Sequence, residues 1–273
     1  MRPALLIDVT KCIGCEECVK ACVKVNNLGV YKPGGDPQIQ DTGDGLSAKR
    51  WTAVVPQAGQ HFVRKQCRHC LEPACVSACP VGAMQKSPEG PVIYDKAICM
   101  GCRYCMVACP FGIPRYEWSS PVPYVNKCVM CYARLKDGNL PACAEACPTR
   151  ATIFGDRDEL IAEATHRLQA EPNKYIHHVY GADEVGGTSV LYVSDIDLGF
   201  LNYKNPLPPE PVPNLTWAVM QQIPTVAVGM AVASSGVYWV IERRMRMARL
   251  KREEERRRRA EEKSHRQEGV EKQ

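Results

Sequence analysis

Short runs of apolar residues predict β-strands at several places along the chain. The run ALLIDVT, residues 4–10, reads as a strand that leads directly into Cys12. A second strand is expected around residues 51–55, and a third after Pro148. A fourth follows the turn at Gly186-Gly187, where the spacing and the final Lys-Ser/Thr of a phosphate-binding loop are missing.

One helix of the ordinary packing kind is predicted near residue 156. Asp156 is placed to cap its first turn, and Glu159 stands three residues later. Its apolar residues recur at helical spacing on one face: Leu160, Ile161, Ala164 and Leu168. A helix packed on a core explains this pattern without any functional role.

A different pattern predicts a membrane helix near the C-terminus. A proline-rich spacer, residues 206–213, precedes a segment with no charged residue from Pro211 to Ile241. About 21 helical residues at ~1.5 Å each span about 32 Å, close to the ~30 Å hydrocarbon core of a bilayer. Trp217 and the Tyr238-Trp239 pair bracket the segment, as interfacial aromatic residues do. Residues 214–241 are therefore expected to span the membrane lipid.

The positive charge of the chain is concentrated in the tail. The formal net charge is +5, and residues 242–273 carry all of it, which leaves a neutral body. Glutamates 253–255 pair at four-residue spacing with arginines 257–259, as in a solvated helix. Arginine beside the span predicts a cytoplasmic C-terminus and a body on the outer, periplasmic side of the inner membrane. A neutral body argues against nucleic-acid binding.

The N-terminal residues MRPALLIDVTKC have neither a long apolar stretch nor a twin-arginine pair. A body on the outer side then needs another route across the membrane. We expect it to cross already folded, together with a partner that has its own export signal.

Composition indicates that metal sites or disulfides organise the interior. The chain has 16 cysteines and only four phenylalanines in 273 residues. A chain this poor in large apolar side chains is usually stabilised by cross-links or metals. The cysteines fall into four groups of four with none left over: Cys12, Cys15, Cys18, Cys22; Cys67, Cys70, Cys75, Cys79; Cys99, Cys102, Cys105, Cys109; and Cys128, Cys131, Cys143, Cys147.

Three chemistries compete for these groups. Disulfides do not suit tightly spaced CxxC pairs in repeated short loops. Structural zinc prefers two CxxC pairs with a longer spacer between them. The run C-x2-C-x2-C-x3-C-P is the bacterial ferredoxin pattern for [4Fe-4S] clusters, and its fourth cysteine ligates the other cluster of a pair. Four [4Fe-4S] clusters are the favoured interpretation, with no catalytic residue in the chain.

The spacing suggests how each group works. The first three cysteines are expected on a tight loop with its amides turned towards the sulfides. The fourth is expected to open a helix and reach the neighbouring cluster, with the following proline at the first helical position. Pro80, Pro110 and Pro148 stand there in three groups, and Val23 replaces proline in the first.

Chain separation favours one pairing of the groups. Only residues 80–98 separate groups two and three, whereas residues 23–66 separate groups one and two. Groups two and three are therefore expected to share one unit, and groups one and four the other. The predicted ligand sets are Cys12, Cys15, Cys18 with Cys147; Cys128, Cys131, Cys143 with Cys22; Cys67, Cys70, Cys75 with Cys109; and Cys99, Cys102, Cys105 with Cys79. The alternative pairs group one with two and three with four.

The predicted fold is α+β, with two bacterial-ferredoxin-like two-cluster units, insertions and one C-terminal transmembrane helix. Trp51 is expected to pack, and His69 to form a hydrogen bond or face solvent rather than tune a cluster. The expected layout is a first unit from residues 1–31 and 125–155, a surface insertion at 32–59, a second unit at 60–124, an extension with the proline-rich spacer at 156–213, the membrane helix at 214–241 and the basic cytoplasmic tail at 242–273.

Several motifs together resemble a known family. They are the interrupted fourth group, LSAKRWT, GCRYCMVACPF, VGGT and one C-terminal span. With the four groups they look like the membrane-anchored four-cluster iron–sulfur (beta) subunit of nitrate-inducible-type formate dehydrogenase, over residues 4 to about 241. The chain is also similar to the iron–sulfur subunit of uptake hydrogenase, which tends to carry a twin-arginine leader.

The resemblance implies an electron-transfer role. In such complexes a molybdenum- or tungsten-pterin subunit oxidises formate, and electrons pass through the clusters to a membrane cytochrome b and quinone. The same role in a hydrogenase or another molybdopterin enzyme is the alternative. A self-sufficient enzyme or a cluster-bearing sensor is less favoured, because no substrate motif is present. Neither the donor, the direction of flow nor the cluster potentials follow from the sequence.

Overall fold

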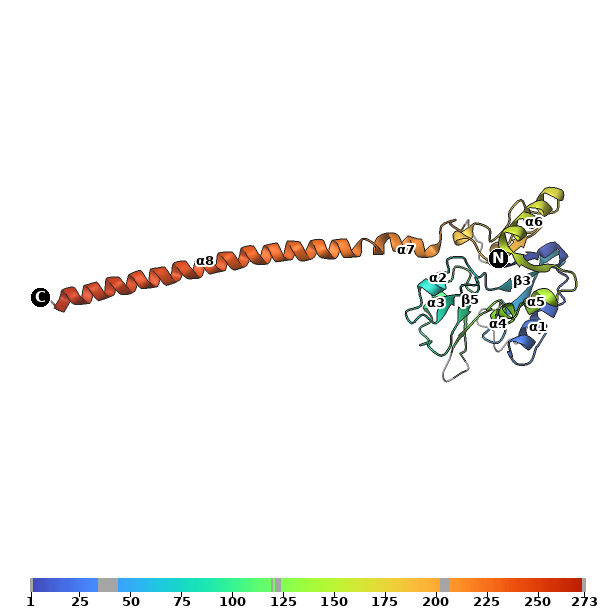
Figure 1. The fold of residues 1–273 in the computed structure, drawn as a ribbon, viewed down its shortest axis with the longest axis horizontal. Coiled ribbons are helices and arrows are strands. Elements are labelled where there is room, and N and C mark those ends of the chain that lie inside the picture. The colour runs from blue at the N-terminus through green and yellow to red at the C-terminus, as the bar shows by residue number, and fades with distance from the viewer. Residues whose placement is uncertain (1, 34–43, 119, 121–123, 202–206, 272–273) are drawn as a thin grey trace. The chain divides into compact units, whose positions relative to one another are not determined.

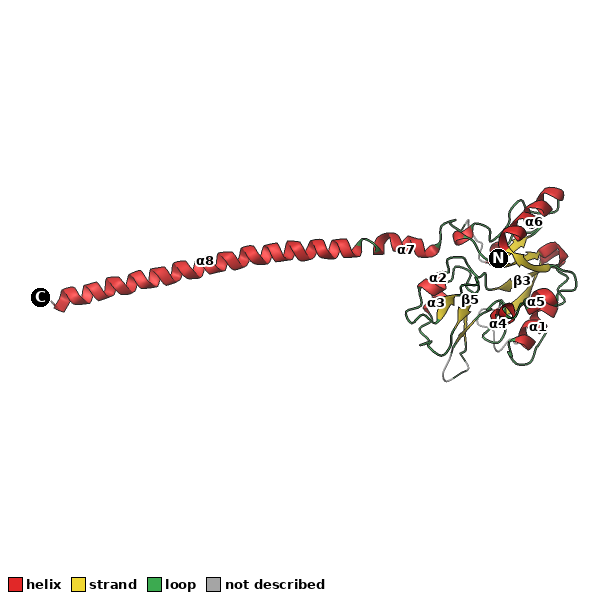
Figure 2. Cartoon of the chain, in the orientation of Figure 1, coloured by secondary structure: helices red, strands yellow, loops and turns green. Residues whose placement is uncertain are grey.

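The computed structural model describes residues 2–33, 44–118, 120, 124–201 and 207–271. The chain divides into two units, Met1–Thr216 and Trp217–Gln273. The first unit mixes short helices and strands, and the second is helical (Figure 2). The predicted α+β class is confirmed, together with one C-terminal apolar helix.

A three-stranded sheet lies at the centre of the first unit. Its strands are β1 (Pro3–Asp8), β8 (Thr152–Asp156) and β9 (Val190–Val193), in the order β8-β1-β9. β1 pairs antiparallel with β8 and parallel with β9. Every residue of β1 is buried, in keeping with its apolar run Pro3–Ile7, and the strand ends at the buried Asp8. The strands predicted at the N-terminus, after Pro148 and after Gly186-Gly187 are confirmed.

Helix α6 (Arg157–Ala170) packs on this sheet. Asp156 accepts a hydrogen bond from the Asp158 N–H and so caps the helix, as the sequence predicts. Leu160, Ala164 and Leu168 are buried against apolar residues of β1 and β9. The segment predicted as a C-terminal extension thus completes the sheet that β1 begins.

A β-hairpin links cysteine groups one and two. Its strands are β2 (Thr52–Gln57) and β3 (His61–Gln66), which confirms the strand expected near Trp51. Ala53 of β2 and Leu46 are both buried in the main apolar core. Residues 34–43 of the predicted surface insertion lie outside the described residues. In its later part Leu46, Ala48 and Ala53 are buried, whereas residues 58–60 are exposed.

The cysteine groups lie on short elements around this sheet and hairpin. In Figure 1 helices α2, α3 and strand β5 gather in one region, and α1, α4 and α5 in another. Helix α1 packs against α5, and α2 packs against α3. The elements are α1 (Glu17–Val25), α2 (Ala74–Ser77), β4 (Met84–Lys86), β5 (Val92–Tyr94), α3 (Tyr104–Ala108), β6 (Arg115–Tyr116), β7 (Val125–Asn126), α4 (Tyr132–Lys136) and α5 (Ala142–Glu145). The described residues also form four 3-10 turns: Val9–Lys11, Ala58–Gln60, Glu184–Gly186 and Gly199–Leu201.

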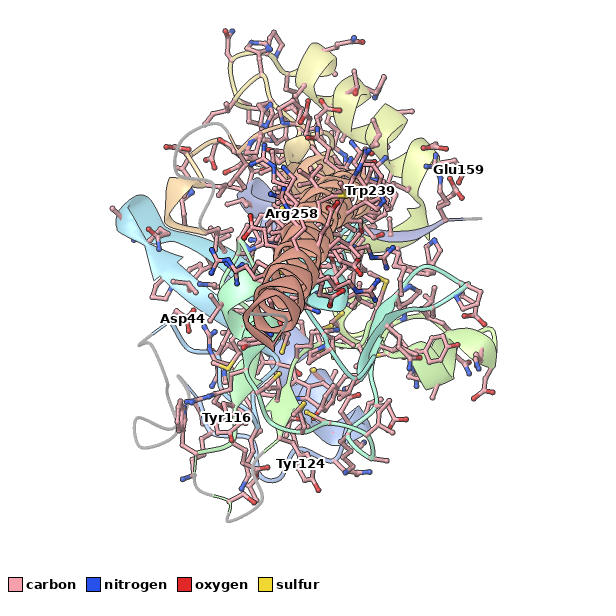
Figure 3. The ribbon with its side chains drawn as sticks, turned by 90° about the vertical axis from the view of Figure 1, so that its left-hand side faces the viewer. Asp44, Tyr116, Tyr124, Glu159, Trp239 and Arg258 are labelled. Carbon is pink, nitrogen blue, oxygen red and sulfur yellow. The ribbon has the colours of Figure 1, made fainter. Side chains whose placement is uncertain are left out.

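Two helices end the chain, α7 (Val212–Met220) and α8 (Ile223–Glu271). In the part of the chain that is described, residues 212–260 are long and apolar enough to cross a membrane, by length and composition. The membrane span predicted at residues 214–241 lies within this stretch and stays a prediction, and the helix is interrupted at residues 221–222. Pro224 lacks an N–H and therefore suits the first turn of α8. Trp239 and Arg258 both lie on α8 (Figure 3).

Asp44, labelled in Figure 3, joins Lys65 of the hairpin strand β3 to Arg115 of β6. One carboxylate oxygen, Oδ2, accepts from Lys65 Nζ and from Arg115 Nη2, each at 2.6 Å. Burial alone would raise the pKa of Asp44, but the Lys65 hydrogen bond and the Arg115 charge lower it to about 2. The carboxylate contributes stability at neutral pH, and this contribution falls as pH drops from about 4 towards 2.

Replacing this carboxylate tests its structural role. We expect Asp44→Asn to lower the free energy of unfolding by about 2 kcal/mol at pH 7, because two largely buried cations lose their counter-charge. The measurement is the guanidinium concentration at the midpoint of unfolding, with unfolding monitored by visible absorbance. Glu117→Gln is the matched control, since Glu117 forms a 3.9 Å pair with the exposed Lys49 and should change little. Equal effects of both substitutions would contradict the assignment.

Candidate iron–sulfur centres

All sixteen cysteines lie within the described residues, and all are free thiols. Disulfides therefore do not hold this structure together. In the described ranges, no three His, Cys, Asp or Glu side chains converge on a point suited to one metal ion. The thiols are instead distributed around short loops and helix starts.

Each CxxC loop bends at the residue before its second cysteine. This residue has a left-handed backbone in all four groups, with φ of 73° at Gly14, 49° at His69, 74° at Gly101 and 53° at Met130. Glycine adopts this conformation freely, whereas His69 and Met130 do so at a steric cost. The bend turns backbone N–H groups inwards: Gly101 donates to Cys99 Sγ at 3.4 Å, and Met130 donates to Cys128 Sγ at 3.3 Å.

The Cys-Pro pairs begin turns, and the prediction that they begin helices is wrong. The carbonyls of Cys79, Cys109 and Cys147 each accept from the N–H three residues later, at 3.0–3.3 Å. Proline stands second in each turn, where its fixed φ is equally suitable. Short helices α2, α3 and α5 come before the fourth cysteine of their groups and contain the third.

These turns direct amides at the sulfur of the fourth cysteine. Ala83 donates its N–H to Cys79 Sγ at 3.2 Å. Burial raises the pKa of Cys79, but amides of residues 81–84 outweigh it, and the net pKa is lowered. Hydrogen bonds to a thiolate favour its charged form, which is the form that binds iron.

Four cysteines from two distant groups meet around one enclosed cavity. Its lining includes Cys22 of group one and Cys128, Cys131 and Cys143 of group four. Burial raises the pKa of Cys22, and the nearby sulfurs of the three group-four cysteines raise it further. The N-terminal and group-four segments therefore converge, although more than one hundred residues separate them.

Cysteines of different groups also come together at the other sites. The sulfurs that raise the pKa of each cysteine identify its neighbours. Burial raises the pKa of Cys12, with further contributions from Cys147 and Cys15. At Cys70, burial and then the charges of Cys109, Cys67 and Cys75 raise the pKa. At Cys105, burial and the charges of Cys102, Cys79 and Cys99 raise it to about 11. These neighbours coincide with the predicted ligand sets, whose assignment stays a prediction.

Adjacent sets lie in series. Cys143 contributes to the raised pKa of Cys18, after burial, and so links the first set to the second. Cys67 contributes in the same way at Cys128, and Cys105 contributes at Cys75. These contributions link the four predicted sets as neighbours, from that of Cys12 to that of Cys99.

The surroundings of the cysteines fit an iron–sulfur cluster. Gln66 lines the cavity at Cys22, and its buried Nε2 amide has no hydrogen-bond partner in the described chain. His69 accepts from the Val92 N–H through Nδ1 at 3.0 Å, as expected of a structural histidine. Burial and nearby lysine charges lower the pKa of His69, so Nε2 holds the proton and is a second buried donor without a described partner. Buried donors beside sulfur suit sulfide acceptors.

Comparison with known proteins defines the class. The family model described as "4Fe-4S dicluster domain" matches residues 59–157, which contain cysteine groups two, three and four. The chain is therefore a ferredoxin-like iron–sulfur protein.

Three relatives extend the likeness beyond this domain. A protein of Nitratidesulfovibrio vulgaris is 39% identical over 251 residues, 89% of this chain and 68% of that protein. Hydrogenase-2 operon protein HybA of Escherichia coli O157:H7 is 39% identical over 230 residues, 70% of each chain. The iron–sulfur subunit of nitrate-inducible formate dehydrogenase of Escherichia coli K12 is 38% identical over 200 residues, 70% of this chain and 67% of that protein.

The chain belongs to the family of iron–sulfur electron-transfer subunits of oxidoreductase complexes that includes these formate dehydrogenase and hydrogenase-2 proteins. The resemblance drawn from the sequence is confirmed, as is the prediction that the chain is not a catalytic subunit.

Proposed function

We propose that this chain carries electrons through four [4Fe-4S] clusters arranged in series. The observation that supports this most directly is the convergence of cysteines from distant groups, repeated along one line of sites. The ligand sets proposed are Cys12, Cys15, Cys18, Cys147; Cys22, Cys128, Cys131, Cys143; Cys67, Cys70, Cys75, Cys109; and Cys79, Cys99, Cys102, Cys105.

The chain's own residues prepare these sites. Bound clusters supply one-electron redox chemistry. The left-handed loop residues and the Cys-Pro turns direct N–H groups at the ligand sulfurs. Six of the sixteen cysteines are buried, and burial raises the pKa of thiols such as Cys18 to about 12. Iron must displace these protons on binding, so cluster insertion and folding are coupled.

The proposed donor is a molybdenum- or tungsten-pterin subunit that oxidises formate. Identity of 38% to the formate dehydrogenase subunit supports this partner. Identity of 39% to HybA over a longer stretch supports a hydrogenase as the alternative. The cysteine sites carry electrons from either donor, because neither substrate meets this chain.

A membrane acceptor is proposed from the C-terminal helix. The uncharged first part of α8 is long enough to cross the inner membrane once, and arginine-rich residues follow it directly. We propose a cytoplasmic C-terminus, a cluster domain on the periplasmic side and a membrane cytochrome b that receives the electrons. Ala227, Ala231 and Ser235 are small residues on one helix face, suited to close packing against a partner helix.

Paired cysteine substitutions test the ligand sets. Cys12→Ser with Cys147→Ser affects one proposed set, so the full-length chain purified without oxygen should retain about 12 of about 16 iron atoms. Cys12→Ser with Cys143→Ser affects two sets and should leave about 8.

The comparison of the two double variants separates the pairings. If groups one and two shared a unit instead, the Cys12/Cys147 double variant would lose two clusters. Equal iron loss in the two double variants would therefore contradict the crossed sets proposed here. The Cys12→Ser single variant is the control and should match the Cys12/Cys147 pair.

The electron donor is tested in washed membranes kept free of oxygen. We expect low-temperature EPR signals from several reduced clusters after formate is added. Reduction by hydrogen alone would move the chain to a hydrogenase complex. If neither reductant acts while dithionite reduces the clusters, both proposed donors are wrong.

A further inference from the structure

Arg64 is a buried cation among cysteine sulfurs. It lies on β3 and is 2% exposed. Its Nη2 group donates to Cys143 Sγ at 3.3 Å, and Nη1 donates to Thr152 Oγ1 at 2.9 Å. Nη2 also donates to Gln66 Oε1. The guanidinium therefore contacts a cysteine of group four, although Arg64 lies on β3, a strand that contains no cysteine.

No carboxylate balances this charge within the described residues. The polar partners of Arg64 are a hydroxyl, an amide oxygen and the sulfur, and its Nε has no partner there. Two other buried arginines have a carboxylate partner: Arg50 pairs with Glu16, and Arg115 pairs with Asp44. A buried cation without a counter-charge is strongly unfavourable, so its stability depends on negative charge at the nearby sulfurs.

The sulfurs near Arg64 belong to two proposed sites. Burial lowers the pKa of Arg64, but the charges of Cys143, Cys18 and Cys128 outweigh it and raise the net pKa. Cys18 belongs to the proposed set of Cys12, whereas Cys143 and Cys128 belong to the set of Cys22. The sulfurs that act most strongly on Arg64 therefore come from groups one and four.

We propose that the positive charge of Arg64 acts on two clusters, those held by cysteine groups one and four, and raises the reduction potential of both. This inference rests on the ligand sets proposed above. Reduction adds one electron to a site, taken from its neighbour or a mediator, and no bond breaks. The added negative charge is stabilised by a fixed buried cation more than the oxidised state is, because screening by water is excluded.

Two substitutions test this charge, one by deleting it and one by supplying a counter-charge, and a third retains it. Arg64→Met deletes the cation and keeps an apolar side chain of comparable length. Gln66→Glu leaves Arg64 in place and gives Nη2 a carboxylate partner with nearly the same shape as glutamine. Arg64→Lys retains the charge and should preserve most of the effect. Because Gln66 itself lines the cavity at Cys22, the deciding measurement in Gln66→Glu is the potential of the cluster held by Cys12, Cys15, Cys18 and Cys147. That potential tests the proposal even if Arg64→Met fails to assemble.

The measurement is mediated redox titration of the purified full-length chain, followed by EPR. We expect Arg64→Met and Gln66→Glu to lower the midpoint potential of two of the four clusters. The expected change is at least tenfold in the oxidised-to-reduced ratio at fixed potential, about 59 mV for one electron. The other two clusters should keep their potentials.

Arg157→Met is the matched control. Arg157 is also buried, but its guanidinium donates to the carbonyls of Thr188 and Ala182, and no cysteine acts on it. This variant should lose stability without any shift in potential. Unchanged potentials in Gln66→Glu, or equal shifts of all four clusters, would overturn the proposal. Mediators and dithionite reduce the clusters without any partner, so the result is independent of whether formate or hydrogen is the donor.

Discussion

The structure depends on one constraint: cysteine sulfurs from groups that lie far apart in the sequence must come together at shared sites. Cys22 near the N-terminus lies at the same cavity as Cys128, Cys131 and Cys143. The sheet order β8-β1-β9 serves this convergence, since β1 leads into group one and β8 follows group four. Long-range strand pairing holds the two segments together beside the sulfurs, in a chain with few aromatic residues to form a conventional core.

Burial gives these sites their electrostatic character. Thiols in low-dielectric surroundings resist ionisation, and backbone amides from tight turns partly offset that resistance, as at Cys79. Buried cations add to the same balance, as Arg64 does beside Cys143. Buried cations of this kind are unfavourable in a chain without metal, and they are stabilised beside anionic clusters. The polar interior is therefore consistent with a protein whose folding and cofactor insertion are one process.

Patterns over a few residues of sequence predicted the features that short-range interactions determine. The cap at Asp156 and the apolar face of α6 were predictable, because helical spacing and capping act within a few residues. The cysteine spacing likewise identified the chemistry. The role of Pro80 was predicted wrongly, since a fixed φ suits a helix start and a turn equally, although Gly82 at the end of the turn was an available signal. The parallel pairing of β9 and the burial of Arg64 depend on tertiary contacts that no local pattern reveals.

The proposed four-cluster path is tested most directly by the iron and acid-labile sulfide content of the full-length chain, purified in detergent without oxygen. Four complete ligand sets predict about 16 iron atoms and a matching amount of sulfide per chain. A content near 8 iron atoms in fully loaded protein would mean that half of the cysteine sets hold no cluster, and it would contradict a four-cluster path.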